Sequence, residues 1–208
     1  MSTTRQRILD TAEVCFAKNG FDGCSLREIT SLADMNLGAV NYHFGSKGEL
    51  FTEVLRRRIE PMNRRRLELL DLAIARHEPE SAPLEEILYA FVRPAIEAFD
   101  TPARGTLLGL LRGVHEGSFD PELFNEFFAH VLQRFSILRD ASGGLSELEY
   151  LGRIRFVVGG MIHLLADRMW RGSSLDTDTV TQLVVAWAAG TFRAPILLVE
   201  NETPGGQQ

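Results

Sequence analysis

The chain has 208 residues, 45% of them hydrophobic, and its 22 Lys and Arg against 28 Asp and Glu give a formal net charge of −6. This apolar content is enough for a sizeable core, in one large domain or two small ones. The sequence has no apolar run long enough to cross a bilayer and no signal-peptide pattern at its N-terminus, so we expect a cytoplasmic protein with no membrane partner.

The first predicted helix covers residues 4–18 and ends at Asn19-Gly20. Apolar side chains recur along it at helical spacing and predict one buried face: Ile8, Leu9, Ala12 and Phe16. The two cysteines, Cys15 and Cys24, have a spacing that matches neither a zinc motif nor a redox pair. We therefore interpret Cys15 as a small core residue, with a thiol sensor as the alternative, and we expect no metal site and no cofactor.

Residues 25–47 read as two short helices joined by a tight turn, followed by the start of a third. Ser25 with Glu28 forms a capping box for the first helix, and Asn36 is a favourable N-cap for the second, residues 37–44. Gly45 is a suitable residue to end that second helix. A short helix held across another presents a ridge that fits the DNA major groove, so the segment predicts a sequence-specific DNA-binding protein.

The predicted second helix has one apolar and one polar face. Val40 and Phe44, four residues apart, would pack inward. Small Gly38 and Ala39 let the helix enter a groove, where Ala39 can touch a thymine methyl and Asn41 can pair with adenine. The remaining candidates are placed to reach phosphate oxygens or to begin a helix beside them. The predicted DNA-binding residues are Ser25, Arg27, Asn36, Gly38, Ala39, Asn41, Tyr42, His43 and Lys47. A plain three-helix bundle with a polar face is the alternative.

The run from Arg5 to about Phe51 resembles the N-terminal domain of the tetracycline-repressor (TetR) family of bacterial transcription regulators. The residues that carry the resemblance are RILDTAEVCFAKNGFDGCSLREI and LADMNLGAVNYHFGSKGELF, and VNYHFGSK is the most specific part. It is particularly similar to members whose larger domain responds to fatty-acyl or other apolar molecules. Two residues depart from the pattern. Asp34 stands in the turn where the family usually has Gly, and Asn41 stands where it commonly has Tyr.

The charge is unevenly distributed along the chain. Residues 1–70 carry a net charge of +2, and residues 71–208 carry −8. Because the local field at the groove governs DNA binding, the negative total does not argue against it. The acidic remainder should discourage non-specific DNA binding.

A longer helix is predicted from Lys47 onward, with Ser46 and Glu49 as its capping box, and it meets Pro61. Because the apolar pattern resumes beyond this proline, we expect one long kinked helix, with a break at Pro61 as the alternative. The arginine triplets 56–58 and 64–66 flank the proline. They indicate either a solvated helix face with salt bridges or a hinge whose charges pair with the larger domain in one of two states.

The rest of the chain also reads as helical, after a linker at residues 77–83. The helices are expected at residues 84–100, 102–115, 121–139, 146–170 and 179–192, and residues 201–208 as a disordered tail. We find no convincing strand. The predicted fold is all-α, with about nine helices, a helix-turn-helix DNA-binding domain in residues 1–50 and a larger effector-binding and dimerisation domain in residues 51–200.

The last two helices are apolar nearly all round, so a second subunit is their natural cover. The family resemblance also implies that the final two long helices form a four-helix dimer interface. The predicted interface residues are Val157, Gly160, Met161, Val184, Trp187 and Ala188. A twofold dimer would place two recognition helices about 34–36 Å apart, on successive turns of a near-palindromic site.

The middle helices are rich in phenylalanine, which indicates either an ordinary aromatic core or a pocket with a few polar groups. The family resemblance implies an effector pocket here. The candidate effector-binding residues are Phe99, Arg112, His115, Phe128, Phe156 and His163, and Arg153 is a further polar candidate.

The sequence therefore predicts a transcriptional regulator, most often a repressor in the resembled family, that binds a palindromic DNA operator as a homodimer and is released by a small apolar effector. An enzyme is not expected, because the chain lacks a GxSxG elbow, a P-loop, an HExxH motif and a metal-spaced Cys/His cluster. A constitutive DNA-binding protein without an effector remains open, since a pocket and a core look alike in sequence.

Overall fold

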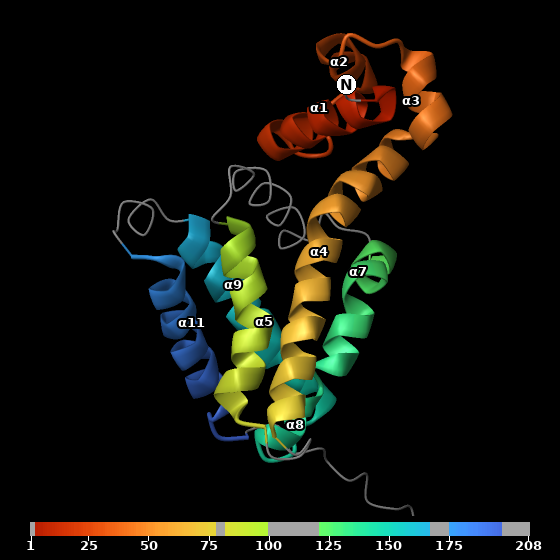
Figure 1. Ribbon diagram of the computed structural model, residues 1–208. Coiled ribbons are helices and arrows are strands. Elements are labelled where there is room, and N and C mark those ends of the chain that lie inside the picture. Colours follow the sequence, from red (N-terminus) through yellow and green to blue (C-terminus); the bar gives the residue numbers. More distant parts are fainter. Residues whose placement is uncertain (1–2, 78–81, 100–120, 167–174, 197–208) are drawn as a thin grey trace, which may run out of the picture.

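The structure, a computed structural model, describes residues 3–77, 82–99, 121–166 and 175–196. These residues form nine α-helices and no strand, which confirms the predicted all-α class. The helices are α1 (Thr4–Asn19), α2 (Leu26–Leu32), α3 (Leu37–Phe44), α4 (Lys47–Arg76), α5 (Leu84–Phe99), α7 (Pro121–Arg134), α8 (Ile137–Ala141), α9 (Glu147–Ala166) and α11 (Thr177–Phe192). The first three pack together at one end of α4, and the others form a bundle around its other end (Figure 1).

The N-terminal bundle of α1, α2 and α3 has a small apolar core that the start of α4 completes. Its most deeply buried side chains are Ile8, Ala12, Phe16, Ile29, Val40 and Leu50. Phe21, in the turn that follows α1, was expected to fill the core between the first two helices. It packs on the rings of Phe16 and Phe51, with centroids 6.0 and 5.0 Å away, and closes one side of this core. Burying these side chains supplies the main driving force for this fold.

Each predicted N-cap in this part of the chain is confirmed. The Ser25 hydroxyl accepts a hydrogen bond from the Glu28 amide at 3.1 Å. The Asn36 side-chain oxygen accepts from the Ala39 amide at 2.8 Å, and the Ser46 hydroxyl accepts from the Glu49 amide at 3.1 Å. These bonds satisfy amides that the helices themselves leave unpaired, so they fix where α2, α3 and α4 begin.

Two residues with positive φ set the turns on either side of α3. Asp34, with φ of 53°, adopts the left-handed conformation for which glycine is usual at this turn. Gly45, with φ of 75°, ends α3 as predicted.

The interpretation of the cysteines was incomplete. Cys15 is buried as expected, but it forms a disulfide with Cys24, and their Cα atoms lie 6.1 Å apart. The fold brings them together because the chain turns after α1 and returns along its end. Sequence spacing alone could not show this return.

Helix α4 is continuous through Pro61, so a break at that residue is wrong. Its 30 residues span about 45 Å, and the helix changes direction along its length (Figure 1). Pro61 is exposed and deprives the Arg57 carbonyl of its helical donor, a known cause of such bends. The same helix belongs to both parts of the molecule and connects them.

In the larger bundle, α5 lies between α4 and α11, and α7 lies against the other side of α4 (Figure 1). Its interior is strongly aromatic: Phe91, Phe99, Phe135 and Phe192 are all buried. No described helix is long and apolar enough to cross a membrane. Within the described ranges, no group of three or more His, Cys, Asp or Glu is placed to hold a metal ion.

Two predicted helix boundaries were wrong. The helix expected over residues 121–139 is divided into α7 and α8. Around Ser136 the backbone amides donate to carbonyls three residues back instead of four, and the Ser136 hydroxyl donates to the Gln133 carbonyl. The last helix begins at Thr177 rather than at residue 179, since Asp176 caps it by accepting from the Thr179 amide at 2.7 Å. The helix predicted at residues 102–115 and the tail at 201–208 lie outside the described residues.

Candidate nucleic-acid interface

One face of α3 is open to solvent. Leu37, Gly38, Asn41 and Tyr42 are exposed, and their spacing places them on a single side of the helix. Tyr42 is the most prominent, with 85% of its surface exposed. The opposite side, through Val40 and Phe44, is buried in the N-terminal core, so the helix cannot roll without losing that packing.

Polar contacts from α1 hold the turn that precedes α3. The Arg7 guanidinium donates to the Ala33 carbonyl at 2.8 Å, at the end of α2. It also lies 3.8 Å from the carboxylate of Asp34, the residue in the left-handed turn. The Arg5 guanidinium lies 5.1 Å from the centroid of the Phe44 ring, at the far end of α3. The exposed helix is thus supported at both ends.

The other predicted DNA-binding residues lie around this face but differ in availability. Ser25 and Arg27 are exposed at the start of α2. Asn36 is exposed, but its oxygen is occupied by the cap of α3. Ala39 and His43 are half-buried, although both were predicted to face outward.

Lys47 lies at the start of α4, with its ammonium 4.4 Å above the centroid of the Phe21 ring. This cation–π contact keeps the positive charge near the amino end of α4, where backbone N–H groups also face outward. A phosphate group at this place would meet both.

Sequence reasoning missed Leu37 as a member of the exposed face. Once Val40 and Phe44 are assigned to the core, helical geometry turns Leu37 outward beside Gly38 and Asn41, so the signal was present in the spacing. An exposed leucine here offers an apolar contact of the kind that thymine methyl groups accept.

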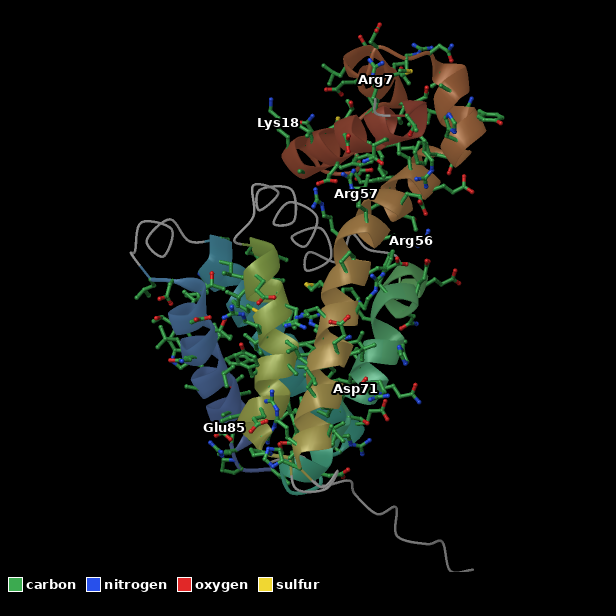
Figure 2. All side chains as sticks on the ribbon, viewed as in Figure 1. Arg7, Lys18, Arg56, Arg57, Asp71 and Glu85 are labelled. Atoms are coloured by element: carbon green, nitrogen blue, oxygen red, sulfur yellow. A yellow bond between two sulfur atoms is a disulfide. The ribbon has the colours of Figure 1, made fainter. Side chains whose placement is uncertain are left out.

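The arginines of α4 connect both parts of the molecule, and Figure 2 shows Arg57 at the junction of α1 with α4 and Arg56 near the upper end of α7. Arg57 pairs with Asp10 of α1 at 2.5 Å, and Arg58 donates to the buried Glu13 of α1 at 2.7 Å. Arg56 pairs with Glu126 of α7, which raises the pKa of that arginine. The arginines of the triplet 56–58 are partly exposed and form salt bridges, as the first interpretation expected. They pair with both α1 and α7, and a hinge with two states stays a prediction.

Comparison with protein-family models finds one match in this part of the chain. Residues 8–54 match the family described as "Bacterial regulatory proteins, tetR family". The N-terminal domain belongs to the TetR family. The match covers most of α1, all of α2 and α3 and the beginning of α4, the elements that build the core beneath the exposed face.

Curated relatives with similar sequence are named as regulators of transcription. Over 90 residues the chain is 40% identical to the HTH-type transcriptional repressor NicS of Pseudomonas putida, a match covering 43% of this chain and 40% of that repressor. It is 38% identical over 53 residues to the HTH-type transcriptional repressor AcnR of Corynebacterium efficiens, covering 26% and 28% of the two chains. The chain thus matches less than half the length of these relatives.

The likeness to solved TetR-family structures extends over nearly the whole chain. The regulator PfmR of Thermus thermophilus superimposes with a TM-score of 0.59 at 20% identity, covering 93% of this chain and 97% of that one. A TetR-like regulator from Rhodococcus gives a TM-score of 0.63 at 19% identity, covering 94% and 98%. At this level of identity the comparison establishes the fold and nothing about ligands.

All six predicted dimer residues line one groove, of about 230 Å³, between α9 and α11. Val157, Met161, Val184 and Ala188 form its buried floor, and Gly160 and Trp187 are exposed. Phe156 and His163, predicted to bind an effector, line the same groove. Phe156 is 72% exposed and Trp187 51%, which leaves two large apolar side chains in water on adjoining helices.

The candidate effector residues are therefore not gathered at one place. Phe99 is buried in α5, and Phe128 of α7 is half-buried against the core. Phe156 and His163 are on the α9/α11 groove, and Arg112 and His115 lie outside the described residues.

Arg153, the further polar candidate, is buried and engaged by the protein itself. It pairs with Glu149 at 2.7 Å and donates to the carbonyls of Thr191 and Phe192 at 3.0 and 2.7 Å. It ties α9 to the end of α11, and this structural role argues against an effector contact.

Proposed function

We propose that this chain is a DNA-binding repressor of transcription that binds a near-palindromic operator as a homodimer and is released from it by a small ligand. The observation that carries the proposal is the exposed face of α3, supported at both ends by arginines of α1 in a domain that belongs to the TetR family. The names of the relatives as repressors support the direction of regulation.

The face of α3 suits the major groove in size and chemistry. Gly38 has no side chain, so the backbone at the start of α3 can approach the bases closely. Asn41, one turn further along, offers an amide that can pair bidentately with adenine, and Leu37 lies beside it for a methyl contact. Tyr42 and Lys47 are placed to reach phosphate oxygens, which position the helix without reading sequence.

The groove between α9 and α11 supports dimerisation. Exposed Phe156 and Trp187 gain the most from being covered, and Gly160 between them allows a facing helix to approach closely. A twofold axis through this groove would make the interface self-complementary and present two α3 helices to one side of a DNA duplex. Two half-sites about 34–36 Å apart would then be bound together.

Helix α4 is the element through which ligand and DNA are coupled in this proposal. It carries ion pairs to α1 through Arg57 and Arg58 and to α7 through Arg56. A change in how α7 or α5 packs on α4 would thus move the DNA-binding bundle. A ligand can shift this equilibrium only by binding the two arrangements with different affinities.

Selection of bound duplexes from a random DNA pool, combined with sedimentation of the protein, tests the proposal. We expect a palindromic consensus with half-site centres about one helical turn apart, bound by two chains. A monomer that shows no preference among duplexes even at low salt would contradict it. A consensus without symmetry would contradict the dimer while leaving sequence-specific binding intact.

A further inference from the structure

A charged side chain lies in the interior of the larger bundle. Arg66, on α4, is only 4% exposed. It occupies one position of the buried face of α4, whose apolar members include Leu55, Ile59, Met62, Leu70 and Ala73. Arginine at such a position is unusual, because a buried charge requires a partner.

The partners that the structure provides for Arg66 are all neutral. Its Nε donates to the Phe91 carbonyl of α5 at 2.9 Å, and one Nη1 hydrogen goes to the Asn63 side-chain oxygen at 3.0 Å. The guanidinium carbon lies 4.4 Å from the centroid of the Phe91 ring. Among the described residues no carboxylate pairs with it, and three of its five N–H donors make no hydrogen bond there.

Asn63 fixes the orientation of this guanidinium. Its side chain is buried, and its amide nitrogen donates to the Phe127 carbonyl of α7 at 2.8 Å while its oxygen faces Arg66. Arg66 and Asn63 therefore form a short polar chain that runs from α5 through α4 to α7. The guanidinium is held in place by this chain and is not free to turn toward solvent.

The buried Arg153 shows how this protein treats an arginine whose role is structural. That guanidinium pairs with Glu149 and donates to four carbonyl groups, those of Thr191, Phe192, Ala194 and Pro195. Its charge is neutralised and its donors are used. Arg66 is just as deeply buried but has neither a counter-charge nor enough acceptors within the described residues.

Burial lowers the pKa of Arg66 to about 10, so the group still carries its positive charge at neutral pH. A single cation matches a single negative charge, which favours a monoanion over a dianionic phosphate. The free N–H groups on Nη1 and Nη2 have the fork geometry that a carboxylate accepts in two parallel hydrogen bonds. The surroundings beyond it are aromatic: Phe91 stacks edge-on against buried Phe135, with centroids 5.2 Å apart.

We propose that Arg66 is the binding residue for the carboxylate of the effector, an amphipathic monocarboxylic acid whose apolar part lies among the phenylalanines of α5 and α7. The inference rests on the proposed function and adds a charged group to a ligand otherwise expected to be apolar. A carboxylate bound to the free N–H groups of Arg66 would pull on a guanidinium that also bonds to Phe91 and Asn63, and so on the chain of contacts that links α4 to α5 and α7. Ligand binding would thereby act directly on the helix that carries the DNA-binding bundle.

The test measures by calorimetry how tightly the purified full chain binds four carboxylic acids and their uncharged alcohols. The acids are octanoate, decanoate, benzoate and phenylacetate, and the matching alcohols are octanol, decanol, benzyl alcohol and phenylethanol. We expect at least one acid to bind ten-fold or more tightly than its matching alcohol. Arg66→Met should abolish that preference, and Arg66→Lys, which keeps the charge but not the fork, should retain part of it. Arg65→Met removes the exposed arginine next to it and should leave the preference unchanged.

Three results would each overturn the proposal. They are equal affinity for acids and alcohols, a preference for acids that survives Arg66→Met, and no binding of any acid. A merely structural Arg66 would change stability without changing the ratio of acid to alcohol affinity, so the ratio separates the two roles. If Arg66→Met does not fold, the partial preference expected of Arg66→Lys decides the matter.

Binding of the selected operator, measured on the same preparations, distinguishes this inference from the proposed function. If the wild-type protein binds acids through Arg66 but binds no DNA sequence selectively, the proposed function is refuted and the carboxylate site is not. Protein that binds its operator but shows no preference for acids would refute the site alone.

Discussion

Arg58 of α4 donates its Nε–H to the buried carboxylate of Glu13 in α1 across 2.7 Å. Glu13, like Asp10, is an acidic residue of α1 that pairs with an arginine of the long helix, and Arg57 lies 3.5 Å from its other oxygen. The two residues are 45 positions apart in sequence, so this contact exists only when α1 has docked on α4.

Glu13→Gln should lower the free energy of unfolding by about 1–3 kcal/mol, because it removes the charge from a buried hydrogen-bonded pair whose arginine is partly exposed. Asp10→Asn is the matched control: it affects the neighbouring pair with Arg57, whose carboxylate is half exposed, and should cost less than about 1 kcal/mol. Urea unfolding of the two variants measures the difference. Equal losses would show that burial of Glu13 adds nothing to the contact.

Lys47→Ala should weaken binding to every DNA sequence by a similar factor and reduce the slope of log affinity against log salt by about 1, because it removes one phosphate contact. Fluorescence anisotropy with the selected operator and with unrelated duplexes at several salt concentrations provides the measurement. A loss confined to one base position, with an unchanged salt slope, would assign Lys47 to base recognition instead.

Asn41→Ala, unlike Lys47→Ala, should weaken recognition of one base position and not binding to DNA in general. If its amide pairs with a base edge, discrimination at one operator position should fall by roughly 1–3 kcal/mol while the salt slope stays the same. Measuring affinity for operators substituted at each position in turn checks this. Equal losses on all of them would move Asn41 from base reading to backbone contact.

The N-terminal bundle could be predicted closely because its signals are local. The caps at Ser25, Asn36 and Ser46 and the glycine at the end of α3 each act within four residues, and the structure contains all of them. Asp34 also has the left-handed backbone that suits the glycine usual in the family at this turn. Such features depend on backbone geometry and need no knowledge of the tertiary fold.

The features that were missed depend on contacts between distant parts of the chain. Arg66 was grouped with its exposed neighbours as one charged triplet, although its spacing of four residues from Met62 and Leu70 places it on the buried stripe. Composition predicted a solvated face, whereas helical periodicity applied to Arg66 alone would have predicted its burial. The role of Arg153 was inaccessible because its carbonyl partners lie 38 to 42 residues further along.

The disulfide between Cys15 and Cys24 should stabilise the N-terminal bundle by roughly 2–3 kcal/mol, since it closes a loop of about ten residues in the unfolded chain. Thermal unfolding with and without dithiothreitol tests this, and Cys15→Ala/Cys24→Ala serves as the control that cannot respond to reductant. An unchanged melting temperature on reduction, with both sulfurs reacting as thiols before treatment, would show that the bond does not form in the purified protein.

Trp187→Arg should convert the proposed dimer into a monomer, because it places a charge where two apolar surfaces would meet and removes one of the two largest exposed side chains of the α9/α11 groove. Leu148→Arg is the matched control: Leu148 is 70% exposed on α9 but does not line the groove. Sedimentation velocity should show a monomer for the first variant and a dimer for the second.

Operator affinity should fall with Trp187→Arg alone, since a single α3 helix loses the effective concentration that the paired half-site provides. A dimeric Trp187→Arg protein, or a monomeric Leu148→Arg protein, would place the interface elsewhere on the molecule.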